Sequence, residues 1–363
     1  MKAFVNNGLL RVARQASGFS QGDAATKLNI PQVTLSRYEN SLSTPTDEFL
    51  KQAAFAYDIP IEFFRQPDAV LGAPVSVHPM WRKKKNISTK EMDLIIAELN
   101  IRIMHIRRML LGVDFEPQTK IPKLDIEEYG EDAERIAALV RAQWQIPQGP
   151  IQNLTAIMER AGIIIIHSAL GGSSVSGVTM SVPGLLPIIL LNNEQPSDRA
   201  RFTLAHELAH LVMHRFPNAE MELQANSFAS ALLMPPGDIQ TAFSGRRIDL
   251  ERLAALKPEW KVSMQALLYR AQSLGFVDKG QAAHLWRKFS LHRIKLREPI
   301  ELDFPMEKPG IISQMIKLHL CNFGYSVPEF GQILHFHPHR LKQYYDLSET
   351  EKNPSGPKLR LAK

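Results

Sequence analysis

The chain contains one cysteine, Cys321, among 363 residues. A single cysteine excludes an intramolecular disulfide and a zinc site built from cysteine thiolates, and it is typical of proteins in a reducing compartment. Apolar runs long enough to span a membrane are absent, and the segment from Met1 to Asn7 lacks the apolar core of a signal peptide. These absences predict a cytoplasmic protein with no membrane partner.

Internal repeats and a glycine-rich phosphate-binding loop are absent as well. Hydrophobic residues make up 44% of the chain, which supports well-packed cores, and the length allows two or more domains. The formal net charge of +6 permits nucleic-acid binding without requiring it. Composition leaves both binding and catalytic functions open.

The most informative stretch is His206-Glu207-Leu208-Ala209-His210, which lies inside an apolar run. On a helix, positions i and i+4 share one face, so two imidazoles at this spacing can bind one metal ion. The glutamate between them is then placed to take a proton from water. The motif predicts zinc-dependent hydrolysis, most often of peptide bonds, with Glu207 as the catalytic group.

A catalytic zinc site needs a third protein ligand and leaves one position for water. Some zinc peptidases place a third histidine six residues after the second, with a glycine between them. Here these two positions are occupied by Met213 and Phe216. This ligand scheme is therefore excluded, and a glutamate on a following helix is the remaining common option.

Residues 219–235 have an apolar stripe at helical spacing and include two candidate ligands, Glu220 and Glu222. We favour Glu222, because Asn226 follows one turn later and can hydrogen-bond a ligating histidine. Either glutamate can instead be a solvated residue of the first helical turn. For His214, which is four residues after His210, we expect a supporting or structural role rather than metal ligation.

The runs from Arg199 to His214 and from Glu222 to Pro235 together resemble the ImmA/IrrE family of metallopeptidases. The resemblance implies a gluzincin-like zinc site in which His206, His210 and Glu222 are the ligands and Glu207 is the general base. One position departs from the family pattern, because Gln224 stands where the family usually has glutamate.

Before this region, three apolar segments at 163–167, 176–182 and 186–191 are separated by proline and glycine, which predicts a small mixed sheet. An edge of that sheet beside the metal-binding helix is where an extended substrate can add as a further strand. After Pro236 the pattern is helical again.

Residues 8–66 read as five short helices. Ser20 and Thr46 are suited to cap helices, Pro31 to begin one, and Asn29 to adopt a left-handed turn conformation. A short helix, a tight turn and a second short helix form the helix-turn-helix pattern.

This segment resembles the Cro/repressor-type (Xre) helix-turn-helix family, through Ser20-Gln21 and the run from Pro31 to Glu39 above all. The resemblance implies binding to a double-stranded DNA operator, with the second helix in the major groove. We expect base contacts from the side chains of Gln32, Thr34 and Arg37, because amide and guanidinium groups suit base readout.

Phosphate contacts are expected from Gln21 and Asn40. Asn29 and Ser41 stand where the family often has glycine, and both residue types tolerate the turn. The alternative is a small helical protein-interaction module, because residues 1–66 carry seven Lys and Arg against six Asp and Glu.

The fold class is therefore multidomain and mostly α. We expect a five-helix helix-turn-helix domain at 1–66, a linker and basic connector helix at 67–118, and an α+β gluzincin-like metallopeptidase domain at 119–300, which holds the small mixed sheet and C-terminal helices. A C-terminal helical unit at 301–346 and a disordered tail at 347–363 complete the chain.

The connector helix follows Trp81–Lys85 and suggests either a phosphate-contacting patch or a solvated, charged helix. His335, His337 and His339 suggest either a metal site or an ordinary surface, and the surface is favoured.

Two functions follow. The first is a zinc-dependent endopeptidase with its own DNA-binding domain, which cleaves or controls a repressor- or antitoxin-type regulator. The second is a non-proteolytic antitoxin or transcription factor whose peptidase-like domain serves as a sensor or a scaffold for a partner toxin. Either is compatible with a homodimer, since two-fold operators mirror dimeric helix-turn-helix proteins.

Overall fold

The computed structural model describes residues 4–72, 88–170, 175–216, 218–345, 347 and 360–361. The chain divides into two compact units: the first unit comprises Met1–Pro74, Lys83–Glu116 and Gly310–Lys363, and the second unit comprises Val75–Arg82 and Pro117–Pro309. The predicted linker Pro67–Pro79 and the tail 347–363 lie largely outside the described residues, and the basic run Trp81–Lys85 lies wholly outside them.

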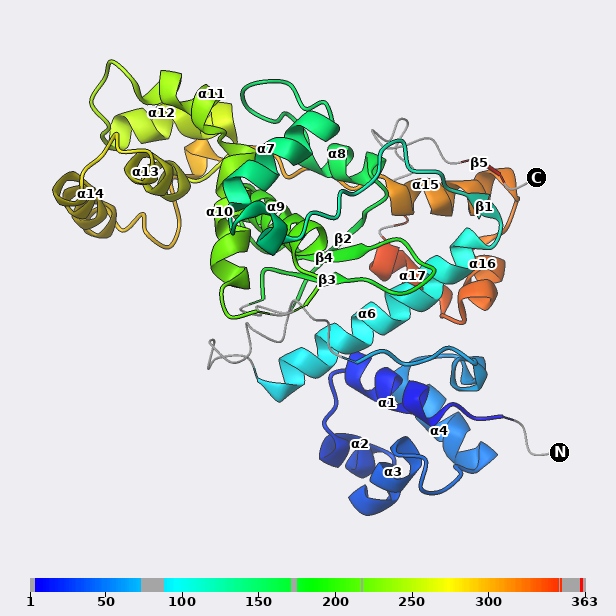
Figure 1. Cartoon of the computed structure of the whole chain (residues 1–363). Coiled ribbons are helices and arrows are strands. Elements are labelled where there is room, and N and C mark those ends of the chain that lie inside the picture. Colours follow the sequence, from blue (N-terminus) through cyan, green and yellow to red (C-terminus); the bar gives the residue numbers. More distant parts are fainter. Residues whose placement is uncertain are drawn as a thin grey trace. The chain divides into compact units, whose positions relative to one another are not determined.

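The first unit begins with the predicted run of short helices (Figure 1). These are α1 (Asn7–Ala16), α2 (Gln21–Lys27), α3 (Gln32–Glu39) and α4 (Asp47–Tyr57), and the fifth is a single 3-10 turn, η1 (Ile61–Arg65). The hydroxyls of Ser20 and Thr46 cap α2 and α4 as expected. Asn29 and Ser41 adopt left-handed backbone conformations, with φ of 52° and 59°.

The same unit contains α6 (Thr89–Leu110), α15 (Ile311–Lys317), the π-helical turn η4 (Leu318–Asn322), α16 (Val327–Leu334) and α17 (Pro338–Tyr345). Two short strands, β1 (Val113–Asp114) and β5 (Arg360–Leu361), pair antiparallel. Helix α6 contacts α1, α15 and α16. Thirteen of its 22 residues are buried. It is therefore a core helix and not the solvated connector that its charge suggests.

Two buried polar residues of α6 are held by α17. The guanidinium of Arg102 stacks on the Tyr344 ring at 3.9 Å and donates to the Tyr344 carbonyl at 2.9 Å. The His105 Nδ1 atom lies 2.8 Å from the Tyr345 hydroxyl. Of the three alternating histidines, His339 lies against Asp58 at 2.7 Å, and no metal-type cluster includes them within the described residues.

The second unit contains the predicted small mixed sheet, in the order β2-β4-β3 (Figure 1). Strand β2 (Ile164–Ser168) runs parallel to β4 (Ile188–Asn192), and β3 (Gly177–Met180) runs antiparallel to β4 with Gly177 opposite Leu191. The strands are apolar and almost fully buried. Strand β3 is an edge strand of this sheet.

Helices surround the sheet and complete a single large core. They are η2 (Ile126–Tyr129), α7 (Ala133–Gln143), α8 (Leu154–Arg160), α9 (Ser197–Met213), α10 (Met221–Leu233), α11 (Pro236–Phe243), α12 (Leu250–Trp260), α13 (Met264–Ser273), α14 (Lys279–Leu291) and η3 (Ile300–Leu302). Helix α9 packs on β3, β4 and α10, and α10 packs in turn on α7. This arrangement places α9 between the sheet and a second helical layer.

The grouping of residues 301–346 differs from the expected separate C-terminal unit. Residues up to Pro309 belong to the second unit, where Glu307 accepts from the backbone N–H of Thr155 at 2.7 Å. Residues from Gly310 onward belong to the first unit. Within the described part of the chain, none of the helices has the length and apolar character needed to cross a membrane.

Candidate metal centre and nucleic-acid interface

Three side chains from α9 and α10 converge on one point. The Nε2 atoms of His206 and His210 are 3.1 Å apart, and each lies 3.6 Å from a carboxylate oxygen of Glu222. The i, i+4 spacing brings the two imidazoles together on one face of α9, as the sequence predicted. The packing of α10 against α9 then supplies the carboxylate.

The geometry of this cluster fits a zinc ion. Bonds of about 2.0–2.1 Å in a tetrahedral site place the ligand atoms about 3.3 Å apart, close to the three separations observed. The Oε1 atom of Glu222 is buried and makes no hydrogen bond with the described residues. Because a buried carboxylate oxygen without a partner is costly, a cation at this point accounts for it. Among the described residues this is the one group with metal-ligand geometry.

The second ring nitrogens of both histidines are occupied by neighbouring side chains. His206 Nδ1 lies 3.0 Å from Asn226 Oδ1, so the asparagine oxygen accepts a hydrogen bond from the N–H of that nitrogen. His210 Nδ1 lies 2.9 Å from Nδ1 of His214. Both contacts leave Nε2 as the atom with a free lone pair, which is the form that binds a metal.

A chain of hydrogen bonds continues from His214. Its Nε2 donates to Oε1 of Gln224 at 3.0 Å, and the Gln224 amide donates in turn to Glu131. The donor and acceptor assignments are mutually consistent. His214 accepts at Nδ1 and donates at Nε2, and Gln224 accepts at Oε1 and donates from its amide nitrogen. Gln224 therefore has a defined place as a bridge between His214 and Glu131.

Glu207 lies on the sheet side of α9 and is 2% exposed. Its Oε2 atom accepts a hydrogen bond from the Thr179 hydroxyl of β3 at 2.5 Å. Strand β3 approaches α9 closely at Gly177, where an added Cβ would lie 2.7 Å from Thr203 Cγ2 and 3.5 Å from Glu207 Cγ. The missing side chain of Gly177 thus lets the strand position Thr179 against the carboxylate.

Burial raises the pKa of the Glu207 carboxyl above its ordinary value, because the charged form loses its hydration. The nearby His206 and the Thr179 hydrogen bond oppose this effect. Burial also lowers the pKa of His210 well below its ordinary value, and the two adjacent histidines act in the same direction. A raised carboxyl pKa suits proton exchange, and a neutral His210 suits metal binding.

Buried ion pairs fix the first turns of α9. Lys257 Nζ, which is fully buried, donates to Asp198 Oδ2 at 2.5 Å and to Glu298 Oε2 at 2.8 Å. One turn along α9, Arg201 pairs with Glu307. These contacts tie α9 to α12 and to the segment around residues 298–307.

The structure thus brings together His206, His210, Glu222, Asn226 and His214 as the sequence predicted, with Glu207 beside them. Glu220, the alternative acidic candidate, is exposed. Thr179, Gly177 and Glu131 were not foreseen. Each is far from the motif in sequence and meets it only through tertiary packing, so no local signal identifies it.

In the first unit, α3 presents an outward face. Gln32, Arg37 and Asn40 are exposed and Thr34 is half-buried. The Asn40 amide donates to Ser36 at its own helix end, and the half-buried Gln21 donates to Glu39 at 2.9 Å. Four of the five predicted contact residues therefore lie on or at the end of α3, and Gln21 at the start of α2 is engaged within the domain.

A buried ion pair holds α3 against α1. Arg14 and Glu39, which are 4% and 3% exposed, form two parallel hydrogen bonds of 2.6 and 2.9 Å. Such bidentate pairs fix orientation as well as distance. The outward face of α3 is therefore presented by a rigid support.

Comparison with protein families agrees with this architecture. Residues 158–272 match the IrrE N-terminal-like domain, and residues 10–64 match the helix-turn-helix family. Comparison with curated proteins gives no match. The first stretch contains α9 and α10, and the second contains α2 and α3. Both resemblances seen in the sequence are confirmed: an Xre-type DNA-binding domain is joined to a metallopeptidase-type domain.

Proposed function

We propose that this chain, which joins a helix-turn-helix domain to an IrrE N-terminal-like domain, is a DNA-binding regulator with zinc-dependent endopeptidase activity. Its substrate would be another regulator, of the repressor or antitoxin type, in the cytoplasm. The observation that carries the proposal is the convergence of His206, His210 and Glu222 on one point, with the carboxylate of Glu207 adjoining them on α9.

The chemistry assigns a role to each side chain. His206, His210 and Glu222 would hold a zinc ion, which would supply Lewis acidity for the activation of water and of the scissile carbonyl. Thr179 holds the Glu207 carboxylate in place through the hydrogen bond of its hydroxyl to Oε2. Glu207 accepts a proton from the attacking water and passes it to the leaving amine. Asn226 and His214 hold the two imidazoles in the orientation that ligation needs.

The central experiment uses the full-length chain loaded with zinc and the regulators encoded beside its gene. Glu207→Gln should retain the metal, measured by elemental analysis, and retain DNA binding. Cleavage, followed by mass spectrometry, should fall by roughly 10²–10⁴-fold, as is typical for loss of a general base. Glu222→Gln should instead lose the metal.

Glu220→Gln is the matched control, since Glu220 is an exposed acidic residue adjoining α10 that lies outside the cluster. It should retain both metal and cleavage. Cleavage that survives Glu207→Gln would contradict the peptidase function. If regulation in cells is unchanged by that substitution, the fused domain acts without proteolysis, as a sensor or a scaffold for a partner.

For the DNA-binding half, we propose that the outward face of α3 reads an operator through Gln32, Thr34 and Arg37. Arg37→Ala should weaken specific binding by about 1–3 kcal/mol, measured by fluorescence anisotropy on a selected operator. Lys51→Ala, which removes an exposed cation from α4, is the control and should change affinity little. Unchanged operator affinity in Arg37→Ala would favour a protein-interaction module instead.

A further inference from the structure

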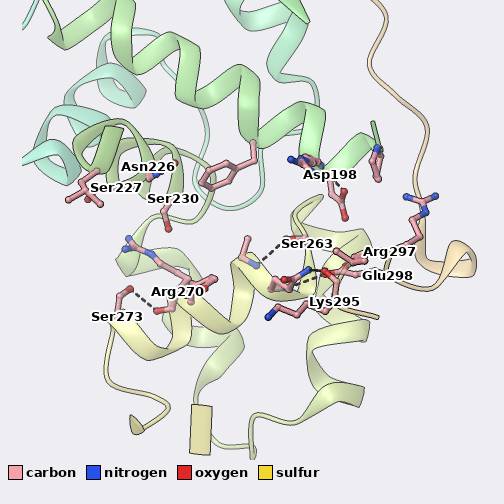
Figure 2. Close-up of a pocket in the computed structure, with 18 of the residues that line it drawn as sticks. Asp198, Asn226, Ser227, Ser230, Ser263, Arg270, Ser273, Lys295, Arg297 and Glu298 are labelled. Carbon is pink, nitrogen blue, oxygen red and sulfur yellow. Dashed lines mark hydrogen bonds between the residues drawn. The ribbon is translucent and has the colours of Figure 1, made fainter. Parts of the chain in front are cut away.

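A large cavity lies in the second unit, between α10, α13 and the segment around Lys295 (Figure 2). Its volume is about 910 Å³. Figure 2 shows Asn226, Ser227 and Ser230 of α10 on one side, Arg270 and Ser273 of α13 on another, and the segment from Lys295 to Glu298 on a third. Asn226 lines the cavity and also bonds His206, so the cavity and the metal cluster share this residue.

The walls include large apolar side chains that are open to solvent. Leu223 is 63% exposed, Tyr269 is 63% exposed and Leu296 is 96% exposed. Phe202, half-buried on α9, adds to the same lining. Apolar surface gathered in a concave site is typical of a binding site, because a ligand that covers it removes the surface from water.

Most charged groups of the walls already have an ion-pair partner within the unit. Glu134 pairs with Arg270 at 2.6 Å, Asp198 and Glu298 share Lys257, and Arg297 pairs with Asp303. Two further cations of the walls, Arg199 and Lys295, lack such partners among the described residues. Over the described residues, the side chains of Arg199 and Lys295 have no hydrogen-bond or ion-pair partner. Because Asp198 and Glu298 share one lysine, the charged wall residues and their partners sum to a net charge of about +1, and the cations without a partner in the described part of the chain are Arg199 and Lys295.

Size and position restrict the ligand. The volume lies at the upper end of the range of about 300–1,000 Å³ for ligand sites, so it can take several amino-acid residues. Phe202 lies one turn before His206 on α9, and Leu223 directly follows Glu222 on α10. The cavity lining therefore begins within about one helical turn of the metal cluster on both helices.

We propose that this cavity binds a segment of the substrate polypeptide that carries a large apolar side chain and a nearby acidic side chain. The apolar side chain is covered by Phe202, Leu223, Tyr269 and Leu296, and the carboxylate pairs with Arg199 and Lys295. This inference rests on the peptidase function proposed above. It makes the cavity the determinant of substrate choice, separate from the groups that carry out hydrolysis.

The test measures binding directly, using the full-length Glu207→Gln chain so that cleavage does not interfere. Two pools of blocked fluorescent decapeptides are compared. Every peptide contains one leucine and one charged residue, and the spacing between the two varies within each pool. The charged residue is glutamate in the first pool and lysine in the second. By anisotropy at low salt, the glutamate pool should bind about tenfold more tightly, the effect of two exposed ion pairs. The preference should shrink as salt is added.

Two substitutions locate the effect in the cavity. Arg199→Glu combined with Lys295→Glu should reverse the preference, whereas Lys279→Glu combined with Arg287→Glu should preserve it, since these two exposed cations lie on α14 outside the cavity. Leu296→Ser should weaken both pools, and Leu291→Ser, 78% exposed on α14, should weaken neither.

Equal binding of the two pools, or a preference that survives the double reversal in the cavity, would overturn the proposal. The outcomes distinguish failure of the peptidase function from failure of substrate selection by the cavity. If the active chain cleaves a regulator and the cavity variants cleave it equally well, the cavity does not select substrate while the peptidase function stands. If the peptide preference is found but no cleavage occurs, the peptidase function fails and the cavity remains a peptide-binding site.

Discussion

The Gln224 carboxamide accepts a hydrogen bond from one neighbouring side chain and donates a hydrogen bond to another. His214 presents an N–H at Nε2, which requires an acceptor, and Glu131 presents a carboxylate, which requires a donor. A carboxamide satisfies both at once, whereas a carboxylate at position 224 would face Glu131 with like charge. The departure from the usual family residue is thus matched by Glu131, and it leaves the orientation of His210 supported.

Gln224→Leu should lower zinc affinity by about 10–100-fold, because His214 loses its acceptor and no longer fixes the ring of His210. Competition with a chromophoric chelator measures the affinity. Glu131→Gln retains an oxygen that accepts from Gln224, so its effect should be smaller. Zinc affinity that is unchanged in Gln224→Leu would show that the hydrogen-bond chain does not support the site.

His167 on β2 gives the second unit a dependence on pH. Burial lowers the pKa of His167 to about 4. An unfolded histidine titrates near 6.5, so between pH 6.5 and pH 4 the unfolded state binds more protons than the folded state. The associated stability is complete above pH 6.5 and is lost as pH falls toward 4, by about 3 kcal/mol in total.

Urea unfolding at pH 7.5, 6 and 5 tests this expectation. His167→Gln should flatten the decline in unfolding free energy of the second unit over that range. His284→Gln removes an exposed histidine of α14 and serves as the control. A decline that is equally steep in His167→Gln would assign the pH dependence to other groups.

At the scale of elements, α9 depends on contacts at its beginning as much as on its own sequence. Lys257 is fully buried between Asp198 of α9 and Glu298, and the two carboxylates outweigh burial so that the pKa of Lys257 is raised. The lysine therefore stays charged inside the fold. Its contacts tie the first turn of α9 to α12 and to Glu298.

Lys257→Met keeps the approximate volume but leaves Asp198 and Glu298 without their cation. We expect the second unit to lose about 3–5 kcal/mol of unfolding free energy, the typical cost of breaking a buried pair. Denaturant titration measures the loss. Adding Asp198→Asn and Glu298→Gln to Lys257→Met should restore much of it, and Lys279→Met on α14 should cost little. A small loss in Lys257→Met alone would contradict the role of this cation.

Elements fixed by local chemistry were predictable from the sequence. The spacing of His206 and His210 determines their common face, Ser20 and Thr46 cap their helices, and Asn29 takes the left-handed turn. Glu222 was favoured through a single neighbour, Asn226, and the structure places its carboxylate beside His206 and His210. In these cases the deciding contacts lie within a few residues or one helix.

Elements fixed by distant partners were not predictable. The Thr179 hydroxyl is 28 positions from Glu207, and Glu131 is 93 positions from Gln224. The burial of α6 was not predictable for the same reason. Its charged residues suggest exposure, but the partner of Arg102 is Tyr344, which lies 242 positions away in the sequence. Sequence periodicity does not reveal contacts of this kind, since they depend on how whole elements pack.

On the scale of the whole molecule, the two compact units should unfold separately, because each has its own core. Removing zinc should lower the midpoint temperature of thermal unfolding for the second unit and leave that of the first unit unchanged. A ligand that binds the folded state stabilises it by about 2.7 kcal/mol at a free concentration one hundred times its Kd. Calorimetry with and without a chelator measures the shift.

His210→Ala provides the control for that measurement, since a chain that lacks one ligand should show no response to the chelator. A chelator-induced shift of both transitions, or of neither, would contradict the assignment of zinc to the second unit.

The first unit is discontinuous, since Gly310–Lys363 belong to it although Pro117–Pro309 intervene. During synthesis, the ribosome therefore delivers α6 long before the tyrosines that cover Arg102 and His105. Translation proceeds from the N-terminus, and earlier domains begin to fold first. A nascent chain thus contains α1 to α4 and α6 before the second unit and α17 have been made. We expect the first unit to reach its full stability only after the last helices have been synthesised.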